Sequence, residues 1–410
     1  MSSYKALLTA ALLACAAVPA AAADFSALAR VIPADSRITD ARRGGASMRL
    51  GLSQGVPYRL YTLDQPPRLV LDFQEVDWTG LEAAALLQGD EVKAVQFGTY
   101  VPGWSRLVLE LAGPMKVATA ALTTDGAGPA ALEVSLVPQS AEGFAAAAGA
   151  PEDARWDAEV PQVPEAAPEG AARPPLVVLD PGHGGIDPGA EAEGSHGHVA
   201  EKDLILGFAY ELSDVLVRSG RFRVQLTRSG DYFVSLEKRI ALAHQAGADV
   251  FVSLHADSLA DGRAHGATVH VLSRDASDVA SAKLAERHDR ADLLAGADLS
   301  AADDRVTGIL LDLARQETQP RSEALARELV KGMAKAGGLM NRRPLRRASF
   351  SVLKAADIPS VLVELGFLSS ERDLANLQNP AWREKIAAGI RDGLIAWQEA
   401  DTAKKALVRQ

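Results

Sequence analysis

The chain has 410 residues, of which 48% are hydrophobic and 5% aromatic, which is enough apolar material for two folded domains rather than one. Its formal net charge of -10 argues against nucleic acid as a partner, because neutralising a phosphate backbone requires a positive surface.

The first 23 residues, 1–23, are typical of an export signal. Lys5 precedes an apolar run, and Ala21, Ala22 and Ala23 form a small-residue cleavage site. The run is too short to span a bilayer, and we expect no transmembrane segment in the mature chain. The sequence therefore predicts a periplasmic protein. The alternative is a lipoprotein site at Cys15, the only cysteine.

Residues 28–138 alternate apolar and polar side chains in short runs separated by turn residues. This period of two is typical of strands, and several such runs predict a small all-β sandwich. The domain contains no histidine, which favours a binding role over metal catalysis. The predicted strands are 47–53, 58–63, 68–73, 106–111 and 132–137.

Residues 139–174 are rich in Ala, Pro, Glu and Gly and lack apolar periodicity, so we predict a flexible acidic linker.

From 175 to 400, short β-branched runs alternate with helical patterns. This alternation predicts an α/β fold, with a mostly parallel sheet flanked by helices. The predicted strands are 176–180, 222–227, 250–254, 268–272 and 361–364, and the helices are 201–219, 235–246, two or more within 277–335, and 382–399.

Three of these strands run into residues of a catalytic type: His183, His255 and Glu364. Ligands of an open α/β sheet bind beyond the carboxyl ends of its strands, so these side chains are expected to converge. Glu201 lies in the first turn of a predicted helix and can face the same edge. Two imidazoles and one carboxylate are a ligand set of catalytic zinc, and a further carboxylate is needed to transfer the proton of the attacking water.

Each of these residues also has a structural interpretation, as a hydrogen-bonded histidine or a favourable helix-start charge. His196 and His198 are rival ligands by pattern alone. The other histidines lie in helical or exposed contexts and are expected at the surface: His244, His265, His270 and His288.

Several segments resemble the zinc-dependent N-acetylmuramoyl-L-alanine amidases: Val-Leu-Asp-Pro-Gly-His-Gly-Gly-Ile-Asp-Pro-Gly-Ala at 178–190, Glu-Lys-Asp at 201–203, Val-Ser-Leu-His-Ala-Asp at 252–257, and Ile-Pro-Ser-Val-Leu-Val-Glu-Leu-Gly-Phe at 358–367. The resemblance implies that His183, Glu201 and His255 bind Zn²⁺ and that Glu364 is the catalytic acid and base. The implied substrate is peptidoglycan, cut between N-acetylmuramic acid and L-alanine.

The N-terminal half is similar to the AMIN domain at residues 66–73 and 105–111, which implies a peptidoglycan-targeting role.

The stretch 277–319 resembles the helical insertion of division amidases. That resemblance implies septal cell-wall splitting, autoinhibition and a periplasmic activator protein. Our hypothesis is that Asp278, or as second choice Glu286, caps the open zinc position; the alternative is that both are solvated helix charges.

A basic run contains Arg342, Arg343, Arg346 and Arg347. It either attracts the carboxylates of muramyl peptides or forms a solvated face.

Two other classes of protein remain as alternatives to an amidase. One is an inactive peptidoglycan-binding or activator protein, and the other is a zinc peptidase or deacetylase that acts on the same polymer.

Overall fold

The computed structural model describes residues 29–74, 76–124, 129–151, 173–194, 197–259, 264–296 and 307–408, without the side chains of 307–316 and 405–408. The predicted export signal 1–23, most of the predicted linker and His196 lie outside these ranges. Among the helices that the structure describes, none has the length and apolar character needed to cross a membrane.

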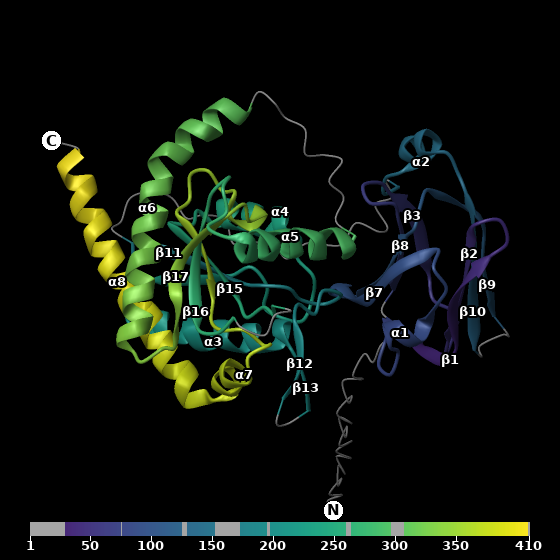
Figure 1. Ribbon diagram of the computed structural model, residues 1–410, viewed down its shortest axis with the longest axis horizontal. Coiled ribbons are helices and arrows are strands. Elements are labelled where there is room, and N and C mark those ends of the chain that lie inside the picture. Colours follow the sequence, from purple (N-terminus) through teal and green to yellow (C-terminus); the bar gives the residue numbers. More distant parts are fainter. Residues whose placement is uncertain are drawn as a thin grey trace, which may run out of the picture.

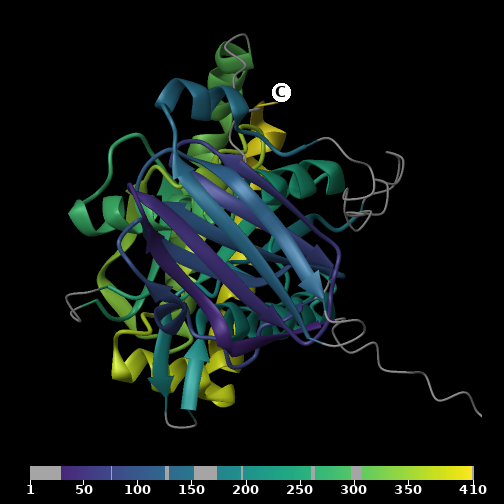
Figure 2. The same ribbon diagram turned by 90° about the vertical axis from the view of Figure 1, so that its right-hand side faces the viewer.

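The N-terminal domain consists of two sheets packed face to face (Figure 1 and Figure 2), which are antiparallel except for two short strands that run parallel to the first strand. One has the order β5-β1-β2-β10-β9, with β6 beside β1, and the other has the order β3-β4-β8-β7. Their facing side chains, such as Leu50, Leu132, Leu71 and Leu107, form one core. The elements are β1 (Ala29–Ala41), β2 (Gly45–Leu52), β3 (Tyr58–Leu63), β4 (Arg68–Gln74), β5 (Val76–Asp77), α1 (Ala83–Leu86), β6 (Leu87–Gln88), β7 (Val92–Val101), β8 (Trp104–Leu111), β9 (Met115–Thr124) and β10 (Ala130–Pro138).

The predicted β domain is therefore present and its last strand ends at 138, but a short helix follows within the predicted linker. Ser140 caps a short helix, α2 (Ala141–Ala147), by accepting a hydrogen bond from the Gly143 N–H. Phe144 of this helix is buried in the sandwich core, and the Gly149 N–H donates to the Thr62 carbonyl. One large apolar side chain, Phe144, in an alanine-rich segment gives no helical periodicity of apolar residues. The composition of the segment therefore indicated a linker.

The C-terminal domain is an α/β layer structure (Figure 1). Its main sheet has the order β14-β11-β15-β18-β16-β17, and it is mixed because β16 and β18 are antiparallel while the other neighbours are parallel. A separate hairpin is formed by β12 and β13. The strands are β11 (Leu176–Pro181), β12 (Glu191–Gly194), β13 (Gly197–Ala200), β14 (Arg223–Leu226), β15 (Val250–His255), β16 (Ala267–Leu272), β17 (Met340–Ala348) and β18 (Ser360–Glu364).

Helices cover both faces of this sheet. Side chains of α3, α6 and α8 pack on one face, against residues such as Val252 and Leu254. On the other face, α4 and α5 pack with Val178 and Phe251. Successive strand residues point to opposite faces, so a strand buried on both sides is apolar throughout. The helices are α3 (Glu201–Arg218), α4 (Leu236–Ala246), α5 (Val279–Leu294), α6 (Thr307–Lys335), α7 (Glu371–Gln378) and α8 (Pro380–Val408), with a short 3₁₀ turn at Ser351–Leu353.

The basic run forms β17 at the edge of the sheet, a strand that the sequence analysis did not predict. Arg346 is paired with Asp278 at 3.0 Å, and Arg347 with Glu323 at 2.8 Å. Two of these four arginines are therefore engaged in ion pairs between elements, and the exposed members of the run are Arg342, Arg343 and Arg347.

Candidate metal centre

The predicted convergence at the strand ends is present. β11 lies beside β15, and β15 beside β18, with His255 directly opposite Glu364 in the strand register. His183 follows β11 by two residues, in a tight turn where it has a φ of 60°. Glu201 begins α3 and reaches the same edge. Such a left-handed histidine conformation is uncommon and is often found at functional sites.

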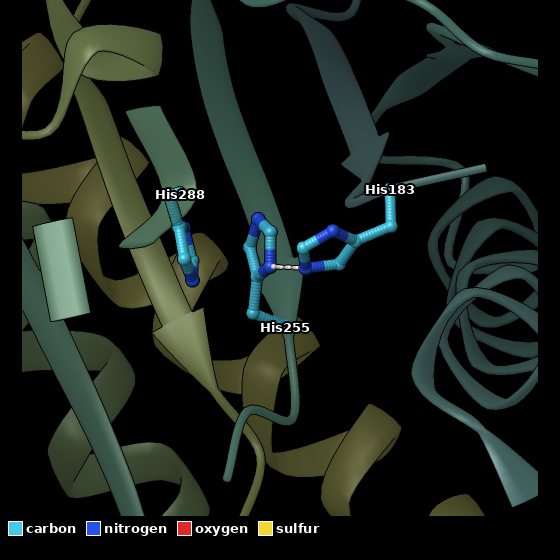
Figure 3. Close-up of side chains that lie close together, drawn as sticks. All are labelled: His183, His255 and His288. Carbon is cyan, nitrogen blue, oxygen red and sulfur yellow. Dashed lines mark hydrogen bonds between the residues drawn. The ribbon is translucent and has the colours of Figure 1, made fainter. Parts of the chain in front are cut away.

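Ligand-type atoms of His183, His255 and Glu201 lie close to one another here, and Figure 3 shows the two histidines. His183 Nε2 is 3.2 Å from His255 Nδ1, and Glu201 Oε1 is 3.1 Å from His255 Nδ1 and 3.3 Å from His183 Nε2. Tetrahedral zinc with bonds of about 2.0–2.1 Å separates its ligand atoms by about 3.3–3.4 Å. The three atoms therefore fit the ligand spacing of one zinc ion.

Neighbouring groups hold these ligands in place. The Nδ1–H of His183 donates to Asp187 Oδ2 at 2.7 Å, which leaves Nε2 directed at the other two ligands. Glu201 accepts the Ala256 N–H at 2.8 Å and the Ala190 N–H at 2.9 Å. The sequence analysis did not single out Asp187, although it lies inside the quoted motif at 178–190.

The electrostatics of the cluster suit cation binding. Burial opposes charge on Glu201, but His183 and two hydrogen bonds outweigh it and hold the pKa of Glu201 well below its usual range. Burial, together with the neighbouring His288, lowers the pKa of His255 to about 4. At neutral pH Glu201 is therefore an anion and His255 is neutral, which are the forms that bind a divalent metal. Burial opposes charge on His183, but Asp187 and Glu201 outweigh it and raise the pKa of His183 well above its usual range, so His183 must give up a proton when it binds a metal.

Glu364 is fully buried beside this cluster. Its Oε2 accepts the Asp257 N–H at 3.1 Å, while Oε1 has no hydrogen-bond partner among the described residues. Burial and then the negative charges of Asp257 and Glu201 raise the pKa of Glu364 well above its usual range. A carboxyl group of this kind can hold a proton near neutral pH, as an acid and base must.

The expectation that His288 lies at the surface is wrong. His288 belongs to α5 and is only 5% exposed, and its ring centre lies 4.3 Å from that of His255 and 5.6 Å from that of His183 (Figure 3). One ring nitrogen from each of these three histidines lies within 4.8 Å of the others. The helix α5 thus brings a third imidazole to the centre.

The remaining histidines lie elsewhere. His270 is also buried, against expectation, and its Nε2 is 3.0 Å from Thr268 Oγ1. His244 and His265 are exposed as predicted. His198 is exposed on the β12–β13 hairpin, where it pairs with Glu191, so it is no rival ligand.

The two acids proposed to cap the metal do not reach the centre. Asp278 accepts the Ser281 N–H at 2.8 Å as the N-cap of α5, and it pairs with Arg346. Glu286 is exposed. A helix presents a new direction at each residue, and in α5 it is the position of His288 that faces the centre.

The free space at the centre is small. A cavity of about 20 Å³ is lined by His183, His255 and His288, with Asp187 and Asp292 among the other lining residues. This volume accommodates roughly one water molecule, whereas ligand pockets are usually hundreds of Å³. The cavity that these described residues line is therefore too small for a polymeric substrate.

Two histidines and two glutamates buried together at the carboxyl edge of an α/β sheet, one of them a carboxyl group that can hold a proton, are typical of the active site of a hydrolase. Residues 177–396 match the model of the N-acetylmuramoyl-L-alanine amidase family, and residues 36–136 match that of the AMIN domain. The chain belongs to the N-acetylmuramoyl-L-alanine amidase family, as an enzyme that also carries an AMIN domain.

Three sequence relatives of known name support this assignment. The chain is 30% identical to the N-acetylmuramoyl-L-alanine amidase AmiC of Escherichia coli over 353 residues, which is 83% of each chain. It is 30% identical to AmiC of Neisseria meningitidis over 87% of this chain and 88% of the relative, and 39% identical to AmiA of Escherichia coli over 57% and 79%. The catalytic domain of CwlV from Paenibacillus polymyxa aligns with 28% identity and a TM-score of 0.40, covering 55% of this chain and 98% of that one.

Proposed function

We propose that this enzyme is a zinc-dependent hydrolase of the amide bond between N-acetylmuramic acid and L-alanine in peptidoglycan. His183, Glu201 and His255 hold the metal. The observation that carries the proposal is the mutual spacing of 3.1–3.3 Å between the three ligand atoms, combined with their chemistry. Zinc, when bound, polarises a carbonyl group and makes water acidic enough to attack it near neutral pH.

Glu364 performs the proton transfer. Its Oε1 has no protein partner among the described residues, so this oxygen is available to accept the proton of the attacking water. The raised pKa of the Glu364 carboxyl lets it keep that proton and deliver it to the departing L-alanine nitrogen. The Asp257 N–H, bound to Oε2, fixes the orientation of the carboxyl group during both steps.

The resting enzyme is autoinhibited by α5, and the residue responsible is His288 rather than Asp278 or Glu286. His288 packs on His255, and the preceding residue, Arg287, donates to the Ser258 carbonyl and to Asp257. Substrate entry requires that these contacts break. An activator protein of the periplasm that displaces α5 would supply the energy for that opening.

The remaining parts of the proposal concern location. The chain is exported by the segment 1–23 and acts in the periplasm during septal cell-wall splitting. The N-terminal domain binds peptidoglycan and keeps the catalytic domain close to its polymeric substrate, which raises the effective substrate concentration. AMIN-domain membership and similarity to AmiC support this part.

The decisive experiment measures bound zinc and the digestion of isolated sacculi by three proteins: wild type, Glu364→Gln and, as a matched control, Glu191→Gln. Each is also made in a His288→Ala background, so that inhibition by α5 does not mask activity. We expect zinc in all proteins. In the His288→Ala background we expect hydrolysis by the protein that is otherwise wild type and by Glu191→Gln, but not by Glu364→Gln. The products should carry new L-alanine amino groups without new reducing ends, whereas a peptidase or deacetylase would release other groups, and an inactive binding protein would release none.

A further inference from the structure

The C-terminal end of α5 is bound by two arginines of the N-terminal domain. Arg68 of β4 and Arg106 of β8 are only 1% and 2% exposed. The Arg68 guanidinium donates to the Leu293 carbonyl, and Arg106 Nη1 donates to the Gly296 carbonyl at 3.1 Å. The last carbonyls of a helix lack partners within the helix and carry the negative end of its dipole, so buried cations are well suited to bind them.

Apolar and charged contacts surround the two arginines. Ala295 packs in one cluster with Val70 and Val108 of the N-terminal domain. Glu110, which is nearly buried on β8, pairs with Arg290 of α5 at 2.9 Å. The outer face of β4 and β8 is thus covered by the end of α5, which points towards β8 in Figure 1.

The N-terminal domain also contacts the loops next to the metal centre. The Ile186 N–H donates to the Thr99 carbonyl at 2.9 Å, and the Phe233 N–H donates to the Tyr100 carbonyl at 2.8 Å. The rings of Tyr100 and Phe233 are stacked with centroids 5.9 Å apart. The two domains therefore share one continuous interface, and α5 is fixed within it.

The same helix carries the group that occupies the centre. His288 precedes Leu293 by five positions, which is about 7.5 Å along an α-helix. Because a helix transmits position rigidly over such a short distance, fixing the end at Leu293 also fixes the imidazole at the centre. An α5 released from Arg68 and Arg106 would keep its contacts with the catalytic domain, which include those of Arg287 and His288, the pair of Asp278 with Arg346 and its packing on the sheet.

We propose that the β4–β8 face of the N-terminal domain is a docking surface for the end of α5, and that the N-terminal domain thereby acts as an inhibitor of its own catalytic domain. This inference rests on the proposed autoinhibition by α5. It assigns the domain a second role beside peptidoglycan binding. A ligand of the N-terminal domain that separates Arg68 and Arg106 from the helix would activate the enzyme.

The test uses the full zinc-loaded chain and two variants on the docking surface. Arg68→Met removes the donor to the Leu293 carbonyl, and Glu110→Gln weakens the pair with Arg290. Glu133→Gln is the matched control, because Glu133 pairs with Arg49 on the opposite sheet of the same domain, away from α5. Hydrogen exchange of the amides of α5 and the release of dye from labelled sacculi are measured in each protein.

A hydrogen bond from a charged group contributes enough that its loss should raise the open population about tenfold or more. We therefore expect about tenfold faster exchange in α5 for Arg68→Met, a smaller increase for Glu110→Gln, and parallel increases in dye release. The control should match wild type. If exchange in α5 is unchanged in both variants while β2 and β10 stay protected, the docking role is overturned.

Two further proteins separate this inference from the proposed function. His288→Ala with an intact docking surface should release dye. If neither His288→Ala nor any other variant releases dye, the proposed hydrolysis fails. If a docking-surface variant shows faster exchange in α5 without faster dye release, only the inhibitory role of the N-terminal domain is overturned. In a Cys15→Ser background, Glu110→Cys and Arg290→Cys joined by a bismaleimide should hold dye release at the uncrosslinked wild-type rate or below. A crosslinked protein that releases dye faster than wild type would overturn the docking role, even if Arg68→Met does not fold.

Discussion

Replacing Asp187 with asparagine should weaken zinc binding by about ten- to a hundredfold, which is the usual effect of losing the carboxylate behind a histidine ligand. The Nδ1–H of His183 donates to Asp187 Oδ2 at 2.7 Å, a length typical of a charge-assisted hydrogen bond. Asparagine preserves the shape but removes the negative charge that strengthens His183 as a ligand. The expected loss corresponds to about 1.4–2.7 kcal/mol of binding free energy.

The assay is an equilibrium competition for zinc against a chromogenic chelator, with the secondary structure followed by circular dichroism. Glu191→Gln serves as the control, because Glu191 also pairs with a histidine, His198, but on an exposed hairpin away from the centre. The control should bind zinc like wild type. An Asp187→Asn protein that is folded and binds zinc as tightly as wild type would refute the assignment of His183 as a ligand supported through Nδ1.

Three other changes test separate parts of the site. Glu364→Gln should retain zinc but lose about 10²–10⁴-fold of the hydrolysis rate measured on sacculi, because the proton carrier is gone. Gly182→Ala should weaken zinc binding in the chelator assay without unfolding the chain, since its Cβ would lie 2.1 Å from His255 Cε1 and displace that ring. Burial raises the pKa of Asp292 to about 7 from 3.8, so its contribution to stability is present below pH 3.8 and is lost as the pH rises through 7. Asp292→Asn should remove this pH-dependent decrease in the free energy of unfolding, which is at most about 4 kcal/mol. Urea denaturation of the zinc-free wild-type and variant proteins at pH 4.5 and pH 8 would detect the difference.

The position of the centre could be predicted because its residues follow strands. Apolar runs that end in His183, His255 and Glu364 are local signals, and the adjacency of β11, β15 and β18 turns them into one site. Glu201 was predicted more weakly from the residues alone, because an acid at a helix start has a common structural explanation. Only the resemblance separated it from His196 and His198.

The role of α5 could not be predicted with the same ease. Its buried positions Ser281, Leu284, His288 and Asp292 follow helical spacing, so a signal was present. It was missed because a helix face that contains serine, histidine and aspartate has the composition of a solvated surface. That face packs on a polar centre, and composition cannot distinguish such a partner from water.

The outer face of the N-terminal domain presents the same difficulty. Arg68, Asp72 and Arg106 alternate with core leucines, which in a single sheet indicates a solvent-facing side. In the structure Arg106 pairs with Asp72 at 2.6 Å, and the other domain covers them. Interfaces between domains resemble ordinary surface in composition, so alternation alone cannot reveal which side of a sandwich is covered.

The chemistry of the α5 contacts makes their release physically reasonable. The contacts at its C-terminal end are largely hydrogen bonds and ion pairs, such as those of Arg68, Arg106 and Glu110, and water can replace them at a modest net cost. The ligand triad is held by β11, β15 and α3 instead, and these elements share an apolar core on the opposite face of the sheet to which α5 contributes no described residue. Withdrawal of the helix would therefore expose the centre while leaving its ligands in place.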